Sequence, residues 1–289
     1  MWLELRLQID PRDSDLVADL LAQCCPRLAV EIDNGEEGQP RAFVKIYVPQ
    51  EDLTALKRSL RLALRFVPLS CTPKWHRARR LREERWHKAW RRHFRPQLIG
   101  SVLVKPPWSK KKGQPGQVTL QIEPGMAFGT GTHPTTALCL HAVQKLIFPG
   151  ARVLDVGTGT GILAIAAAKL GATYALALDI DAEAVKAALG NVEANGVADT
   201  VKVCHGTLTP NILQEGPFHL VIANLDRETI RRLGPLMTAA LAPGGYLVVS
   251  GFLSETVAEL TPLLATYGLR HHQDMMQDGW AAIVMVKDA

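Results

Sequence analysis

The chain has 289 residues and a net charge of +5, and 47% of its residues are hydrophobic, which predicts a globular protein of about two domains. It has no uninterrupted run of the ~18 apolar residues that a membrane helix needs, and its start alternates apolar and polar residues, unlike a secretion signal. The five cysteines form no Cys-x-x-Cys pair, so we expect reduced thiols, no metal site, no disulfide framework and a cytoplasmic location.

The first 72 residues alternate strand and helix patterns in the order of a small α+β domain. Strands are expected near 3–9, 28–32, 42–48 and 66–71, and helices near 14–21 and 50–65. The resulting order, strand-helix-strand-strand-helix-strand, is that of the ferredoxin-like fold. No catalytic constellation lies in this segment, so residues 1–72 are expected to serve recognition.

A basic segment follows, which we expect to be a helical linker over residues 73–99. Between Lys74 and Arg95, ten Lys or Arg residues oppose two Glu, a local charge of +8 that leaves −3 for the rest of the chain. Three aromatic residues recur at helical spacing and predict a helix over residues 78–94: Trp86, Trp90 and Phe94. The basic face suits an acidic partner or RNA phosphates, or it is a solvated helix face. The aromatic stripe packs against a domain or stacks on bases.

Residues 100–289 form the larger predicted domain, in which strands and helices alternate from Ala151 onward. This pattern is typical of a parallel sheet that is covered by helices on both faces. After a first strand at 101–105, strands are expected at 153–156, up to 179, and at 201–204, 218–223, 246–250, 269–275 and 280–286, with helices near 162–170, 182–195, 226–241 and 254–267. The last two strands, separated by Asp278 and Gly279, are expected to pair as an antiparallel hairpin. Such a seven-stranded α/β sheet resembles the class I, Rossmann-like methyltransferase fold.

A glycine-rich turn follows the strand at 153–156 and predicts a nucleoside site. Gly157, Gly159 and Gly161 allow backbone conformations that are closed to residues with a Cβ. Asp179 lies 22 residues beyond Gly157, near the ~20 expected of a carboxylate that accepts hydrogen bonds from ribose hydroxyls. The G-x-G-x-G spacing differs from the dinucleotide pattern G-x-G-x-x-G. It therefore favours S-adenosylmethionine, with NAD and an oxidoreductase as the alternative.

Residues 123–136, EPGMAFGTGTHPTT, form a second candidate element upstream of that strand. Pro134 is placed to begin a helix, whose free amides Thr132, Thr135 or Thr136 can satisfy. Phe128 is placed to close over an adenine ring or the methyl donor, unless it is an ordinary core residue. His133 is expected to be a loop residue bonded to the backbone, and one histidine alone does not indicate a catalytic base.

Asn224 ends the fourth strand of the large domain, within the sequence IANL. Open α/β sheets bind ligands beyond this edge, so the side chain is expected to face the reacting centre. Its carbonyl can accept a hydrogen bond from an amine and its amide can donate one. The alternative is a loop residue that only holds the turn between strand and helix.

Together with the segments RWHKAWRRHFRPQLIGSVLVKPPW and VLDVGTGTGILAIAAAKLGA, these motifs resemble those of the ribosomal protein L-eleven (L11) methyltransferases, the PrmA family. The resemblance covers nearly the whole chain. It implies an N-terminal ferredoxin-like domain that grips the ribosomal protein, a linker helix, and a domain that methylates lysine and N-terminal amines with S-adenosylmethionine. The family's donor-binding positions fall on Thr136, Gly157, Asp179 and Asn224.

The predicted site combines the residues from both lines of reasoning. Asn224 is expected to be catalytic by orienting the amine or the methionine end of the donor. The expected cofactor-binding set is Phe128, Thr132, Thr136, Gly157, Gly159, Gly161, Asp179 and Asn224. The chain departs from the family at Thr158 and Thr160 in the glycine turn, and at Asp226, a carboxylate that caps the next helix or alters amine selection. We expect a monomer. The alternatives are a methyltransferase for RNA or another protein, and a noncatalytic scaffold.

Overall fold

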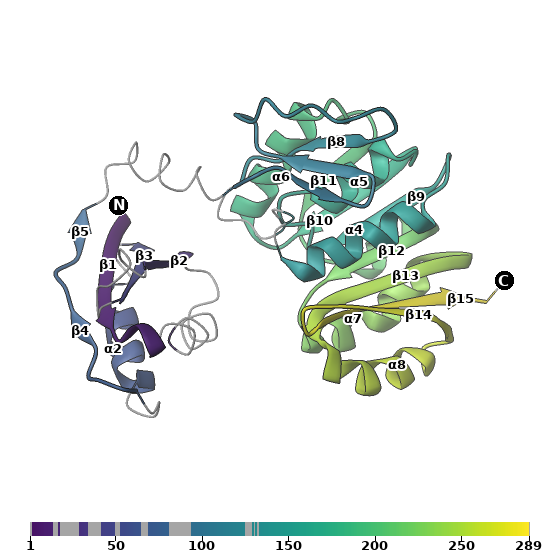
Figure 1. Ribbon diagram of the computed structural model, residues 1–289. Helices are drawn as coiled ribbons and strands as arrows, with labels where there is room; N and C mark the ends of the chain where they lie inside the picture. The colour runs from purple at the N-terminus through teal and green to yellow at the C-terminus, as the bar shows by residue number, and fades with distance from the viewer. Residues whose placement is uncertain are drawn as a thin grey trace. The chain divides into compact units, whose positions relative to one another are not determined.

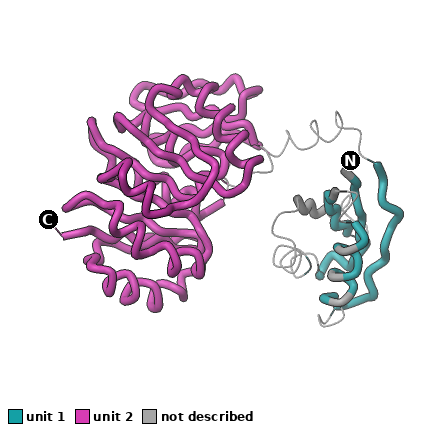
Figure 2. The backbone as a smooth tube through the Cα atoms, turned by 180° about the vertical axis from the view of Figure 1, so that it is seen from behind, with its two compact units in different colours: residues 1–93 teal, residues 94–289 magenta. Residues whose placement is uncertain are grey.

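The computed structural model describes residues 2–13, 17, 29–33, 42–49, 53–64, 69–80, 94–124, 129, 131 and 133–288. The chain divides into two compact units, residues 1–93 and residues 94–289, which Figure 2 shows in different colours. Within the described residues, no helix is long and apolar enough to cross a membrane. No group of three or more His, Cys, Asp or Glu side chains among these residues is arranged to hold a metal ion.

The first unit is an antiparallel sheet with a helix. Its elements are β1 (Trp2–Ile9), η1 (Pro11–Asp13), β2 (Ala29–Asp33), β3 (Ala42–Pro49), α2 (Leu53–Ala63), β4 (Lys74–Trp75) and β5 (Arg79–Arg80). The strand order is β2-β3-β1-β4, and β5 also pairs with β1. Alternate residues of β1 and β3 are buried and pack together with Leu56 and Leu60 of α2. This order and this single apolar face are those of the predicted ferredoxin-like fold.

Two predictions for this unit are wrong in detail. The strand expected at 66–71 is absent from its described part, residues 69–71, and the edge of the sheet is formed by β4 and β5. The helix expected from residue 78 does not begin there, because β5 pairs antiparallel with residues 3 and 4 of β1. The free edge of β1 offers unpaired backbone groups, which an extended segment satisfies. Residues 81–93 and, apart from Val17, residues 14–21 lie outside the described residues, so the helices expected there stay predictions.

The second unit contains the predicted seven-stranded sheet, in the order β11-β10-β9-β12-β13-β15-β14 (Figure 1). The strands are β9 (Arg152–Val156), β10 (Tyr174–Asp179), β11 (Val201–His205), β12 (Phe218–Asn224), β13 (Leu241–Leu253), β14 (Leu269–Gln277) and β15 (Trp280–Lys287). Strands β9 to β13 are parallel, whereas β15 pairs antiparallel with both β13 and β14. Strand β13 begins at Leu241, earlier than the strand expected at 246–250, and its register with β12 shifts between the pairs Phe218–Leu241 and Leu220–Tyr246.

Helices cover both faces of this sheet. They are α4 (Pro134–Leu146), α5 (Ile162–Lys169), α6 (Ala182–Ala194), α7 (Arg227–Ala240) and α8 (Val257–Ala265), with the short helices η3 (Pro210–Glu215) and η4 (Ser254–Thr256). Alternate residues of β9, β10, β12, β13 and β15 enter two separate cores. One core contains α4, α5 and α6, and the other contains α7 and α8, as Figure 1 shows. The near-continuous apolar strands follow from this burial on both sides.

A small third sheet packs on the α4 and α5 side. It consists of β6 (Gln97–Ile99), β7 (Val102–Lys105) and β8 (Val118–Gln121), and only β7 was predicted. Buried residues of this sheet join the same core as α4 and α5. Its last strand leads directly into the segment that begins at Glu123, so the sheet fixes where that segment starts.

The closing hairpin is confirmed at its turn. Asp278 has φ 49° and Gly279 has φ 78°, the two positive values that a two-residue type I′ turn requires. An antiparallel pair at the sheet edge agrees with the class I methyltransferase fold that the sequence resembles.

Candidate active site

The candidate site lies where three neighbouring parallel strands end. In the sheet, β9 stands between β10 and β12, so the turn after β9 lies between Asp179, the last residue of β10, and Asn224, the last residue of β12. The chain leaves β9 toward β10 and later returns to its other side as β12. In open α/β sheets, such a reversal of strand order marks the carboxyl edge at which ligands bind. The predicted residues Gly157, Asp179 and Asn224 are thus brought to one edge.

The glycine turn requires its glycines. Gly157, Gly159 and Gly161 have φ values of 77°, 56° and 82°, a region that side chains with a Cβ rarely adopt. A Cβ on Gly157 would lie 2.4 Å from Cδ2 of Leu225, the residue after Asn224. The amides of Gly157 and Thr158 donate to the Leu178 carbonyl at 2.8 and 2.9 Å, which ties the turn to β10.

Asp179 supports the turn as well as facing the edge. Its Oδ2 accepts from the Gly159 amide at 2.8 Å, and its Oδ1 accepts from the Asp181 amide at 3.0 Å. A carboxylate has about four lone-pair positions, so each oxygen keeps capacity for a ligand hydroxyl. Asp179 is therefore both a structural acceptor and a suitable ribose partner.

Asp155, the residue before the last in the otherwise apolar end of strand β9, was missed by the sequence reasoning. Its side chain is fully buried, and Oδ2 accepts from the Thr158 hydroxyl at 2.6 Å and from the Ala164 amide at 3.3 Å. Burial raises the pKa of this carboxyl to about 6, although the bond from Thr158 opposes the shift. Among the described residues Oδ1 has no partner. A single acid in an otherwise apolar strand was the signal available.

Asn224 carries a similar unpaired atom. Its Nδ2 lies 3.5 Å from the Thr136 hydroxyl, a contact at the outer limit of a hydrogen bond. Its Oδ1 is buried and has no partner within the described part of the chain. Buried polar atoms are rarely left unpaired, so an unpaired oxygen at a ligand-binding edge indicates a place for a ligand donor.

Thr136 belongs to the first turn of α4, which begins with Pro134 as predicted. The helix is capped by His133, whose Nδ1 accepts from the Thr135 amide at 3.3 Å. The His133 ring also contacts Trp280 of β15 edge to face, with centroids 4.6 Å apart. Burial lowers the pKa of His133. His133 thus takes the capping role that threonine was expected to fill, and it is bonded to the backbone.

Phe128 and Thr132 lie outside the described residues, so their expected contacts with the donor stay predictions. Within residues 123–136, the structure describes 123, 124, 129, 131 and 133–136. A further residue beside the edge was missed. Ile180 follows Asp179 and is 73% exposed, and its carbonyl lies 2.9 Å from Nε2 of His205.

A family model described as Ribosomal protein L11 methyltransferase (PrmA) matches residues 1–288. The chain belongs to this family. A relative from Pelotomaculum thermopropionicum, named ribosomal protein L11 methyltransferase, is 37% identical over 305 residues, which cover 98% of this chain and 97% of the relative. A relative of the same name from Syntrophotalea carbinolica is 44% identical over 214 residues, 73% of this chain and 69% of its own length.

A solved structure described as ribosomal protein L11 methylase, from Lactobacillus delbrueckii subsp. bulgaricus, superimposes with a TM-score of 0.61 at 30% identity. It covers 66% of this chain and 96% of that one. Family and fold together make this chain a class I methyltransferase. Members of this class use S-adenosylmethionine as methyl donor, so the NAD-dependent alternative is set aside.

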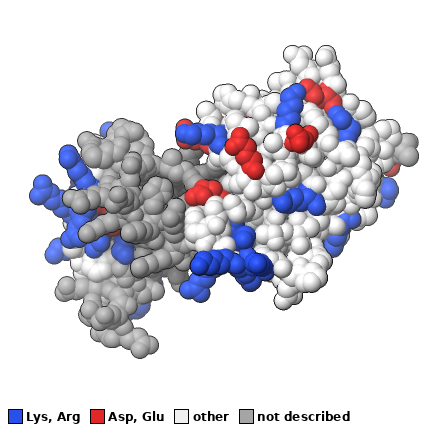
Figure 3. All heavy atoms as spheres, turned by 90° about the horizontal axis from the view of Figure 1, so that it is seen from above, with Lys and Arg blue, Asp and Glu red and all other residues white. Residues whose placement is uncertain are grey.

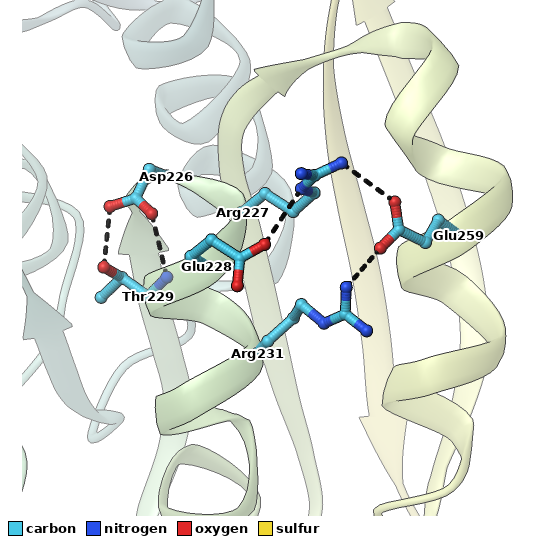
Figure 4. A network of polar contacts seen from close by, with 6 residues as sticks. All are labelled: Asp226, Arg227, Glu228, Thr229, Arg231 and Glu259. Carbon is cyan, nitrogen blue, oxygen red and sulfur yellow. Dashed lines mark hydrogen bonds and ion pairs between the residues drawn. The ribbon is translucent and has the colours of Figure 1, made fainter.

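The Asp226 carboxylate has a local structural role (Figure 4). Asp226 is the N-cap of α7, where its Oδ1 accepts from the Thr229 amide at 3.0 Å and its Oδ2 accepts from the Thr229 hydroxyl at 2.7 Å. Burial opposes ionisation of this carboxyl, yet the bonds from Thr229 hold its pKa below the usual value. On the same helix Arg227 and Arg231 both pair with Glu259 of α8. Asp226 and these pairs fix the start of α7 directly after Asn224.

Proposed function

We propose that this protein transfers methyl groups from S-adenosylmethionine to lysine and N-terminal amines of ribosomal protein L11. The observation that carries the proposal is the Asn224 amide oxygen, buried and unpaired among the described residues, at the edge that also holds Asp179 and the glycine turn. The relatives' names supply the substrate, and this edge supplies the chemistry.

The residues at the edge fit the donor. Gly157, Gly159 and Gly161 leave backbone open to its amino-acid tail, and Asp179 retains acceptor capacity for ribose hydroxyls. The unpaired Asp155 oxygen lies one residue before the end of β9, where an ammonium group would offset its buried charge. When bound, S-adenosylmethionine supplies a methyl group on a cationic sulfur, which is the electrophile of the reaction.

Asn224 serves the acceptor. Lysine has a pKa of about 10.4 in water, but only the neutral amine has a lone pair for the new bond. Desolvation at a partly buried edge lowers that pKa and favours the neutral amine. The Asn224 oxygen then accepts one amine N–H and holds the nitrogen lone pair toward the methyl group, while Thr136 fixes the asparagine amide. The roles of Phe128 and Thr132 in donor binding belong to this proposal as predictions.

The smaller unit is assigned to substrate recognition. We propose that residues 1–72 form the ferredoxin-like recognition domain, whose sheet is completed by β4 and β5. We propose the basic segment at 73–99 as the linker and residues 100–289 as the catalytic domain. RNA contact through Lys74 to Arg95 is not required. On the face in Figure 3, both Lys or Arg and Asp or Glu side chains lie on the described surface. We propose the segment from Lys74 to Arg95 for any contact with phosphates. We further propose a monomer that acts in the cytoplasm, where its substrate is made.

The test is transfer of labelled methyl from S-adenosylmethionine to purified L11, followed by mass spectrometry. Wild type is expected to label lysine and the N-terminal amine, and Asn224→Ala is expected to lose most of this activity. Asn211→Ala is the matched control, because Asn211 is exposed in η3, which precedes β12 and so lies toward its opposite end. If the protein binds the donor but does not label L11, the assignment as a methyltransferase stands and the assignment of L11 as its substrate is wrong.

A further inference from the structure

Two buried asparagines lie one turn apart, Asn191 in α6 and Asn195 at its C-cap. They bond to the end of β8 and to the start of the segment that follows it at Glu123. Asn191 is 1% exposed and Asn195 is 9% exposed. Asn195 Oδ1 accepts from the Gln121 amide at 2.9 Å, and its Nδ2 donates to the Gln121 carbonyl at 2.6 Å. Both bonds of this side chain to other segments therefore go to one residue of β8.

Asn191 instead joins two separate segments. Its Oδ1 accepts from the Glu123 amide at 2.8 Å, and its Nδ2 donates to the Thr160 carbonyl in the glycine turn at 2.9 Å. The orientation of the amide follows from the chemistry, since a backbone N–H only donates and a carbonyl only accepts. Asn191 thus connects the glycine turn to the residue where the upstream segment starts.

Thr160 completes this connection from the other side. Its side chain is fully buried, and its hydroxyl donates to the Gly129 carbonyl. Glu123 and Gly129 flank residues 124–128, so both flanks are tied to Thr160, one through Asn191 and one directly. Helix α6 also packs on the turn nearby, because a Cβ on Gly161 would lie 3.3 Å from Cβ of Ala188.

The two halves of the glycine turn are held by different elements. The first half is bonded to β10, through the Leu178 carbonyl and the Asp179 carboxylate. In the second half, the Thr160 carbonyl receives its side-chain bond from α6 through Asn191. A turn with three positive φ values needs such restraints to keep one conformation. Loss of the Asn191 bond would release the half of the turn that leads into α5.

We propose that Asn191 is a positioning residue for donor binding, which sets the Thr160 backbone and thereby the turn that receives S-adenosylmethionine. This inference rests on the proposed function. It assigns to Asn191 an effect on the donor that Asn195, with equivalent burial and the same kind of bonds, does not have. Asn191 touches neither the amine edge at Asn224 nor the reacting atoms in this role.

The experiment compares Asn191→Ala, Asn191→Asp and the matched control Asn195→Ala in the full chain. Calorimetry measures the Kd for S-adenosylmethionine, initial rates give the KM values for donor and L11, and urea unfolding gives stability. Asn191→Ala is expected to weaken donor binding about tenfold, the effect of losing one well-formed buried hydrogen bond, with the KM for L11 changed less than twofold. Asn195→Ala is expected to lower the free energy of unfolding by about as much as Asn191→Ala does, because both remove buried hydrogen bonds. It is expected to leave the donor Kd within about twofold of wild type.

Asn191→Asp separates the two bonds of this side chain. A carboxylate can still accept from the Glu123 amide, but it offers no donor to the Thr160 carbonyl. This variant is therefore expected to weaken donor binding at least as much as Asn191→Ala. If the asparagine variants fold poorly, Thr160→Val and Thr160→Ser provide a second pair. Valine removes the hydroxyl bond to Gly129 and is expected to weaken donor binding several-fold, and serine, which retains the hydroxyl, is expected to restore it.

Unchanged donor Kd in Asn191→Ala and Thr160→Val, with wild type binding normally, would overturn the inference and leave the proposed function standing. Equal weakening by Asn191→Ala and Asn195→Ala would also overturn it, because both effects would then be structural. Absence of donor binding by wild type would overturn the proposed function and this inference with it.

Discussion

Gly157 lies close to Leu225, the residue after Asn224, so the glycine turn packs against the acceptor side of the site. The substitution Gly157→Ala tests how much free energy this close packing involves. A Cβ at this position would lie 2.4 Å from Leu225 Cδ2, whereas ordinary contacts begin near 3.4 Å. The backbone is also strained for alanine, with φ at 77°. The substitution therefore has two separate costs, one in the backbone and one in the Leu225 side chain.

The magnitudes follow from these two terms. A left-handed conformation costs a residue with a Cβ about 1–2 kcal/mol. Forcing the end of the half-buried Leu225 side chain aside adds about 1–2 kcal/mol, the lower part of the range for overpacking, because a flexible side chain can move. We expect Gly157→Ala to lower the free energy of unfolding by about 3 kcal/mol in total.

Urea unfolding of wild type, Gly157→Ala, Leu225→Ala and the double variant separates the terms. In the Leu225→Ala background the steric cost disappears, so Gly157→Ala should lower the free energy of unfolding by only about 1–2 kcal/mol there. An equal cost of Gly157→Ala in both backgrounds would refute the steric part of the reasoning. The free energy would then come from the backbone alone, and the link between the turn and the acceptor side would carry no energy.

The other predictions concern single groups near the site. Asp155→Asn tests the raised pKa of about 6. As the pH rises from about 4 to 6, the carboxyl loses its proton in the unfolded chain before it does so in the folded protein, so the wild type loses stability in that range. The variant should gain on the order of 3 kcal/mol relative to wild type between pH 4 and pH 7, measured by urea unfolding at each pH, and a constant difference would contradict burial of a charge. Burial raises the pKa of the Cys139 thiol to about 12, so native protein treated with iodoacetamide at pH 8 should be alkylated at the exposed Cys71 and not at Cys139, as peptide mass spectrometry would reveal. Asp226→Ala should lower the free energy of unfolding by about 1 kcal/mol because the helix cap is lost, whereas serine in Asp226→Ser still caps the helix. If Asp226→Ser changes which amine is methylated, the carboxylate also acts on the substrate.

The sequence predicted the large domain best where local signals agreed with the long-range packing. Val153, Leu154 and Val156 are apolar because β9 is buried on both faces, and Asp278 and Gly279 mark a turn that both positive φ values confirm. Asp226 was recognised as a cap because its hydrogen bonds are local. Each of these features depends on residues that are close in sequence.

The errors came from contacts between distant segments. Strands β4 and β5 are two residues each and exist because β1 offers a free edge more than 60 residues earlier, which no local pattern of 74–80 reveals. Strand β8 was missed for a similar reason, because it pairs with β7 across the loop at 106–117. Strand β6 was missed although its pairing with β7 is local, because three residues are too few to show a strand pattern. Asp155 was passed over because its pattern is that of a buried strand, and only the fold shows its unpaired oxygen. Asn191 likewise has its partners 31 and 68 residues away.

The position of β15 in the sheet constrains how the protein can fold during synthesis. Strand β15 follows β14 in the chain but lies between β13 and β14, and its residues from Ala281 to Val286 are buried. On a ribosome, β14 emerges before the strand that will join it to the sheet, and β13 keeps an open edge until then. Non-local pairing of this kind is slow and leaves apolar edges exposed to other chains. The sheet can therefore close only after β15 has been translated.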